Sequence, residues 1–173
     1  MSERQVFNIL VYVSFGLAVG IFISLFFVSA PYGRHARKGW GLSVPSWLGW
    51  LVMEAPSPLV VSILFLVSRA AQTPTTLAFL LMWLAHYVHR AFIYPFERRN
   101  HGNRMPVVVM LMGSIFNLGN AYLNGRYLFY FSPERYPTAW LKDARFICGA
   151  CLFVGGYILN RWADRKLRAL RQP

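Results

Sequence analysis

The sequence predicts an all-α, polytopic transmembrane helical bundle. Of its 173 residues, 56% are hydrophobic and only 14% are charged, and the mean hydropathy is +0.39. A soluble domain carries about 25% charged residues. Five apolar stretches also have the roughly 20 residues that a helix needs to cross a membrane. They are residues 6–30, 47–67, 76–96, 105–130 and 144–162.

The segments between these stretches read as loops. Residues 31–46 are rich in Gly, Pro and Arg, and residues 68–74 are short and polar. The first stretch is too long for a signal-peptide core of about 7–15 residues, so we expect a retained helix. Without an internal repeat or a soluble module, residues 1–173 are expected to form one domain.

The net charge of +12 is compatible with nucleic-acid binding in a soluble protein. Here the basic residues lie between and after apolar runs, so we expect contact with lipid head groups and no nucleic-acid partner. Twelve Lys and Arg residues fall on the side of the first loop, third loop and tail, against six on the other side. The N-terminus is therefore expected on the non-cytoplasmic side and the tail in the cytoplasm.

Glu54 is the only carboxylate in the middle of an apolar run. An ionisable side chain costs about 2.5–3.5 kcal/mol inside a span and usually faces a cavity or a partner. Glu54 either hydrogen-bonds across a helix pair or acts as an acid that burial keeps neutral. Counting 1.5 Å per residue places Tyr87 of the third span at a similar depth, roughly 10–14 Å inside the cytoplasmic boundary.

Tyr87 belongs to a cluster with His86, His89 and Arg90, on or beside one helix face. No further ligand is spaced to complete a metal site with the two histidines, so we predict no metal. Interfacial tyrosines and arginines are also ordinary in membrane helices. Cys148 and Cys151 lie in an apolar run and are interpreted as buried thiols rather than as a redox pair.

Polar side chains also recur at helical spacing in the last two spans. In the fourth span they form an amide face, for which hydrogen bonding between helices is the simpler explanation. In the fifth they form a stripe that suits either a solvated helix end or ribose and phosphate groups, beside a basic loop on the same side. The three sets are Asn117, Asn120 and Asn124; Asn160, Asp164, Arg168 and Arg171; and Arg98, Arg99, His101, Asn103 and Arg104. No glycine-rich nucleotide-binding motif is present.

These motifs, taken in order, resemble the membrane-embedded steroid 5-alpha-reductase family over nearly the whole chain. The family reduces the 4,5 double bond of 3-oxo-4-ene steroids with NADPH. The resemblance rests on Tyr32-Gly33-Arg34-His35, Glu54-Ala55-Pro56-Ser57, His86-Tyr87-Val88-His89-Arg90, Gly119-Asn120, Gly125-Arg126-Tyr127-Leu128, Tyr136-Pro137, Asn160 to Asp164 and residues 167–173.

The resemblance implies a role for each matching position. Glu54 and Tyr87 would polarise the substrate carbonyl, and Trp50 and Phe116 would line the steroid pocket. Met53 and Met112 stand where the family can carry glutamine and arginine, which would affect substrate choice. Cofactor contacts would come from Asn160, Asp164, Arg168, Arg171, Arg90, Arg98, Arg99, Asn103 and Arg104.

Members of the family continue past the Arg-x-Leu-Arg-x-Pro segment with two more spans. The resemblance therefore implies seven spans in the complete enzyme, and we do not expect residues 1–173 alone to be active. We expect a monomer in the endoplasmic reticulum if eukaryotic, or in the inner membrane if bacterial.

Alternatives within enzymes are a reductase of another lipid enone or sterol double bond, or an isoprenylcysteine methyltransferase. In other classes, a transporter would use Glu54 for protons or cations, and a structural subunit would bind no nucleotide.

Overall fold

The computed structural model describes residues 1–28, 39–68, 72–97 and 103–170. Five helical segments in these ranges are long and apolar enough to cross a membrane, which confirms the predicted bundle. The last continues beyond residue 162, because the residues that follow are mostly strong helix formers. The five segments are Glu3–Ser24, Ser46–Val67, Pro74–Glu97, Val107–Phe131 and Ala144–Ala169.

Side chains that cap the first turn mark where three of these helices begin. Ser2 and Thr73 each form a reciprocal capping box, with Gln5 and Thr76 respectively, and Asp143 accepts from the backbone N–H of Arg145. Such caps satisfy N–H groups that have no partner within the helix. The helices that they open are α1 (Glu3–Ser24), α4 (Pro74–Val88) and α7 (Ala144–Ala169).

Prolines interrupt the second span, which consists of α2 (Ser46–Glu54) and α3 (Pro56–Val67). Pro56 and Pro58 have no backbone N–H, so the carbonyl groups four residues earlier lose their helical donors. One of these, the Val52 carbonyl, instead accepts a hydrogen bond from Ser114 Oγ at 3.2 Å. The interruption leaves Glu54 at the end of α2.

The third and fourth spans each contain a widened, π-helical turn. After α4 the chain forms η3 (His89–Ile93) and then α5 (Tyr94–Glu97), which contains Pro95. The fourth span is α6 (Val107–Arg126) followed by η4 (Tyr127–Phe131). Single π-helical turns occur frequently at functional sites, and η3 begins two residues after Tyr87.

A short antiparallel ladder joins the beginnings of α2 and α6. It pairs β1 (Ser43–Pro45) with β2 (Arg104–Pro106), with Val44 opposite Met105. Three-residue strands are too short to give an alternating pattern, so the sequence did not predict them. Two 3₁₀ turns, η5 (Pro133–Arg135) and η6 (Thr138–Lys142), connect the fourth span to α7.

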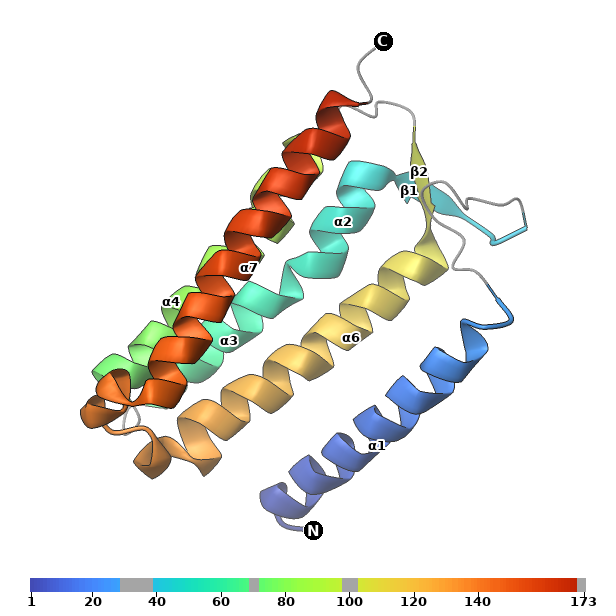
Figure 1. Ribbon diagram of the computed structural model, residues 1–173. Helices are drawn as coiled ribbons and strands as arrows, with labels where there is room; N and C mark the ends of the chain where they lie inside the picture. Colours follow the sequence, from blue (N-terminus) through green and yellow to red (C-terminus); the bar gives the residue numbers. More distant parts are fainter. Residues whose placement is uncertain (29–38, 69–71, 98–102, 171–173) are drawn as a thin grey trace.

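The helices α1, α6, α2–α3 and α4 follow one another across the bundle, and α7 lies in front of α4 in Figure 1. A ring contact between Phe79 of α4 and Phe146 of α7 joins these last two helices. The buried apolar core lies where α3, α4, α6 and η4 meet, away from the ladder, and includes Val61, Phe65, Leu80, Ala121 and Phe129. The prediction that Cys148 and Cys151 are buried is wrong. Both are free thiols that are exposed on α7, because this helix lies at the edge of the bundle.

Candidate functional site

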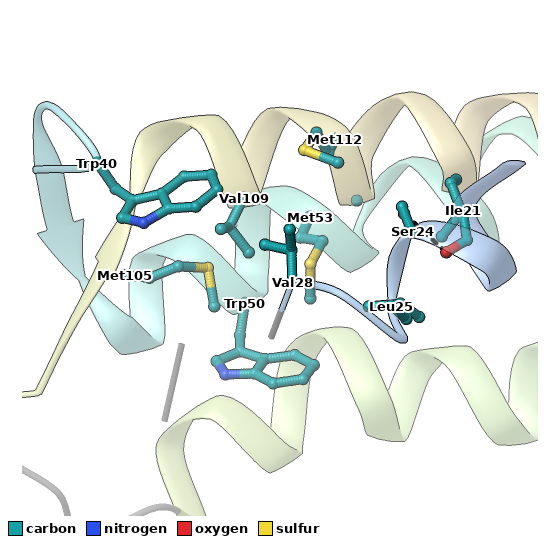
Figure 2. Close-up of a pocket in the computed structure, with 11 residues that line it drawn as sticks. Ile21, Ser24, Leu25, Val28, Trp40, Trp50, Met53, Met105, Val109 and Met112 are labelled. Atoms are coloured by element: carbon teal, nitrogen blue, oxygen red, sulfur yellow. Dashed lines mark hydrogen bonds between the residues drawn. The ribbon is translucent and has the colours of Figure 1, made fainter. Parts of the chain in front are cut away.

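An apolar cavity of about 470 Å³ lies between α1, α2 and α6. Figure 2 shows its wall of aromatic, aliphatic and methionine side chains. The hydroxyl of Ser24 is engaged by its own helix, since it donates to the Ile21 carbonyl at 2.8 Å. Cavities that bind drug-sized molecules have volumes of about 300–1,000 Å³. The lining residues are Ile21, Ser24, Leu25, Val28, Trp40, Trp50, Met53, Met105, Val109, Met112 and Gly113.

The two residues expected to line a steroid pocket lie in different places. Trp50 is buried and lines the cavity. Phe116 is 67% exposed and is not among the lining residues. Met53 and Met112 both line the cavity, one from α2 and one from α6 (Figure 2).

Glu54 is a buried carboxylate with two hydrogen-bond donors. Arg90 Nε donates to its Oε1 at 3.3 Å, and Asn117 Nδ2 donates to its Oε2 at 3.4 Å. Asn117 Nδ2 also donates to the Met53 carbonyl at 2.9 Å, so it binds the end of α2 at two points. Accepting from a guanidinium and an amide is the pattern of an ionised carboxylate.

Arg90 links this carboxylate to the cavity wall. Its guanidinium lies 4.7 Å from the centroid of the Trp50 ring and 5.0 Å from that of Tyr94, and these two rings meet edge to face. Stacking on aromatic faces suits the planar guanidinium group. The ion pair of Arg90 and Glu54 therefore lies directly behind Trp50.

Tyr87 is held by its ring and by its oxygen. The ring stacks on Trp83 at a centroid distance of 5.0 Å and meets the His86 ring edge to face at 4.9 Å. Its Oη accepts a hydrogen bond from Asn120 Nδ2 at 3.3 Å. Among the described residues no hydrogen bond joins Tyr87 to Glu54. The two are instead held by Asn120 and Asn117, one helical turn apart on α6.

The amide face predicted on the fourth span thus makes hydrogen bonds between helices. Asn117 binds α2 and Asn120 binds α4, whereas Asn124 donates within α6 to Asn120. The spacing of these three residues was the signal that identified them. Spacing alone did not show that they contact the two candidate catalytic side chains.

A second polar cluster joins α5 to α7. Glu97 accepts a bidentate pair of hydrogen bonds from Arg161, at 3.2 and 3.3 Å, and a further one from Arg168. His89 contacts Arg161 and lies 3.7 Å from Glu97. Sequence reasoning did not assign Glu97 a role, although it is one of only six carboxylates in the chain.

The residues predicted to bind a cofactor do not form one group. Arg90 pairs with Glu54, Arg168 with Glu97, and Arg104 binds the side chain and carbonyl of Ser43. Asn160 and Asp164 lie on α7, before and after Arg161 in the sequence. The carbonyl of Asn103 accepts from the Ser46 N–H. Three predicted residues lie outside the described ranges: Arg98, Arg99 and Arg171.

Comparison with known proteins identifies the family. The family model described as 3-oxo-5-alpha-steroid 4-dehydrogenase matches residues 103–173. The chain is 33% identical to 3-oxo-5-alpha-steroid 4-dehydrogenase 1 of Bos taurus, over 100% of this chain and 68% of that protein. It belongs to the steroid 5-alpha-reductase family.

Other members of the steroid 5-alpha-reductase family match over similar lengths. The human 3-oxo-5-alpha-steroid 4-dehydrogenase 1 is 34% identical over 100% of this chain and 66% of its own length. The steroid 5-alpha-reductase DET2 of Arabidopsis thaliana is 32% identical over 87% of this chain and 59% of its own. The chain thus spans about two thirds of the length of these relatives, and the resemblance seen in the sequence is confirmed.

Proposed function

We propose that this protein reduces the 4,5 double bond of a 3-oxo-4-ene steroid, or of a closely related lipid enone, with NADPH. The observation that carries the proposal is that the two candidate catalytic side chains bind α6, a helix that also lines an apolar cavity. Glu54 and Tyr87 each accept a hydrogen bond from one of two asparagines that lie one turn apart on α6, and Trp50 connects the Glu54 ion pair to the cavity. The names of the relatives supply the substrate class.

The proposed role of Glu54 and Tyr87 is to stabilise charge on the substrate oxygen. When bound, NADPH would supply the hydride that is added to the β-carbon of the enone. Negative charge then develops on the 3-oxo oxygen, and donors placed there stabilise the transition state more than the ground state. A proton taken up from water at the α-carbon completes the reduction. Tyr87 donates through its hydroxyl. Glu54 donates only after it takes up a proton, which weakens its ion pair with Arg90.

The donor set near the end of α7 fits a dinucleotide phosphate. Arg161 and Arg168 already converge on one carboxylate, Glu97, and guanidinium groups bind phosphate with the same bidentate geometry. Asn160 and Asp164 offer groups for ribose hydroxyls on the same helix. We propose that these residues hold the cofactor.

The test compares turnover of Glu54→Gln and Tyr87→Phe in the full-length protein in nanodiscs. We expect each substitution to lower kcat by about a hundredfold to a thousandfold, as the loss of an oxyanion donor does. Glu134→Gln on η5 and Tyr12→Phe on α1 are matched controls at exposed positions, and should leave kcat unchanged. Unchanged turnover in both Glu54→Gln and Tyr87→Phe would refute these roles.

We also propose that the protein acts as a monomer, with its N-terminus on the non-cytoplasmic side and the end of α7 in the cytoplasm. The excess of Lys and Arg on one side supports this orientation. Single cysteines at Ser2 or Lys166, in a Cys148→Ser/Cys151→Ser background, test it in sealed vesicles. A membrane-impermeant maleimide should label the two from opposite sides.

A further inference from the structure

Three side chains on α6 and α4 form a hydrogen-bond chain with a defined direction. Asn124 Nδ2 donates to the backbone carbonyl of Asn120 at 2.8 Å and to its side-chain Oδ1 at 2.9 Å. A backbone carbonyl can only accept, so the Asn124 amide nitrogen must face Asn120. The amide oxygen of Asn120 is then occupied as an acceptor, and its Nδ2 faces Tyr87 Oη.

The direction of this chain determines what the Tyr87 hydroxyl can do. Its oxygen accepts from Asn120, so its own proton points elsewhere. Within the described ranges no residue accepts that proton. The ring contacts with Trp83 and His86 limit rotation of the side chain. Tyr87 is therefore left as an oriented hydrogen-bond donor whose acceptor is not supplied by these residues.

We propose that Asn120 and Asn124 are positioning residues that orient and polarise the Tyr87 hydroxyl toward a substrate carbonyl. This inference rests on the proposed function for the identity of that carbonyl. Each donor in a hydrogen-bond chain polarises the next, by about 10–30% per bond. The amide of Asn120 also stabilises the phenol oxygen as it gains negative charge when its proton is shared with the substrate.

Asn117 provides a matched comparison on the same helix face. It lies one turn before Asn120, but it donates to the Met53 carbonyl and to Glu54 Oε2 and so serves α2 rather than Tyr87. Removing either amide takes away a hydrogen bond between helices. Of these two losses, only that of Asn120 should remove a hydrogen bond from the Tyr87 oxygen.

The first experiment observes Tyr87 directly and does not depend on turnover. The ¹³Cζ resonance of Tyr87 is assigned in ring-labelled full-length protein by comparison with Tyr87→Phe. We expect Asn120→Leu, Asn120→Asp and Asn124→Ala to shift it, and Asn117→Leu to leave it in place. Asn120→Asp has the shape of asparagine but no amide donor, so it separates the direction of the hydrogen bond from packing. An unshifted resonance in Asn120→Leu would overturn the proposal.

The second experiment is a double-mutant cycle on turnover. Asn120→Leu should lower kcat by about threefold to tenfold, the rate equivalent of one neutral hydrogen bond, with little change in KM. In a Tyr87→Phe background the same substitution should have no further effect on kcat. An equal loss in both backgrounds would overturn the positioning role. A shifted resonance together with normal turnover in Tyr87→Phe would refute the role proposed for Tyr87 at the substrate carbonyl and leave the hydrogen-bond chain standing, whereas absence of any steroid turnover in the unmutated protein would refute the proposed function.

Discussion

At the scale of single residues, the buried carboxylate of Glu54 depends on partners from two other spans. Arg90 and Asn117 lie 36 and 63 residues away in the sequence, yet each donates to one of its oxygens. Charge-assisted hydrogen bonds of this kind offset the cost of removing a carboxylate from water. The ion pair therefore binds α2 to η3 as well as preparing the proposed site.

Removing only one partner of this pair is expected to destabilise the protein. Arg90→Met should lower the free energy of unfolding by about 3 kcal/mol, because it leaves a buried charge without its counter-ion. Denaturant unfolding in mixed micelles measures the change. The double variant Arg90→Met/Glu54→Gln should recover part of the loss. A double variant less stable than Arg90→Met would contradict the ion-pair explanation.

The lowered pKa of Asp143, the residue before α7, predicts how the stability of the protein depends on pH. The guanidinium of Arg145 and, to a smaller extent, its backbone N–H donate to the Asp143 carboxylate and lower its pKa from 3.8 to about 2. A depressed pKa means that this stabilisation is present above pH 3.8 and is lost as the pH falls toward 2. Asp143→Asn keeps a capping side chain but should remove this acid-dependent part of the thermal unfolding profile. If the unfolding temperature of Asp143→Asn falls just as steeply between pH 3.8 and pH 2, another group is responsible for the pH dependence.

At the scale of elements, close approach between α6 and the second span depends on glycine. A Cβ on Gly113 would lie 2.3 Å from Met53 Sδ, and one on Gly125 would lie 2.7 Å from Leu64 Cδ1. These positions leave room for side chains of α2 and α3 against the α6 backbone. The same close packing brings Ser114 and Asn117 to the carbonyl groups at the interruption between α2 and α3.

Alanine substitutions along α6 should separate packing from helix propensity. Gly125→Ala should destabilise the protein by about 1–3 kcal/mol through overpacking, whereas Gly113→Ala should displace the flexible Met53 side chain and narrow the cavity. Gly119→Ala is the control, since nothing lies within 4 Å of the added Cβ. It should be neutral, or stabilising by about 0.5–1 kcal/mol. Equal stability of Gly119→Ala and Gly125→Ala would show that α6 does not pack as described.

At the scale of the whole molecule, α1 stands at the edge of the bundle and is bound mainly at one end. Glu3 forms an ion pair with Arg126, and Phe7 meets the Phe131 ring edge to face at 4.9 Å. The other end of α1 contributes Ile21 and Ser24 to the cavity, and Leu25 follows just after the helix (Figure 2). The beginning of the helix is thus held by an ion pair and a ring contact, and its far end forms part of the cavity wall.

Breaking the Glu3–Arg126 contact should loosen α1 without unfolding the core. Arg126→Met is expected to broaden the distance distribution between spin labels at Gly16→Cys and Gly119→Cys. These sites have open space around an added Cβ, and the labels are placed in a Cys148→Ser/Cys151→Ser background. Tyr12→Leu, at a position 76% exposed, is the control and should leave the distribution unchanged. A distribution equally narrow in Arg126→Met would mean that the ion pair does not hold α1.

The sequence by itself determined the membrane-protein class, the five apolar spans that the described residues form, and the conspicuous positions of Glu54 and Tyr87. These properties are local, because the length of an apolar run and the position of a charge within it are fixed by consecutive residues. The asparagine spacing in the fourth span was readable for the same reason. The expectation that the substrate is a steroid and the cofactor NADPH came from the family resemblance and not from the composition.

Only the tertiary structure decided which side chains meet. In the structure Glu54 pairs with Arg90, and Arg161 and Arg168 pair with Glu97. Asn117 donates to α2, whereas Asn120 donates to Tyr87. Phe116 is exposed and does not line the cavity. The physical reason is rotational freedom. A helix that is apolar on every side carries little periodic signal for which face turns inward. Its rotation, and with it the direction of each hydrogen bond, follows from packing against neighbours distant in the chain.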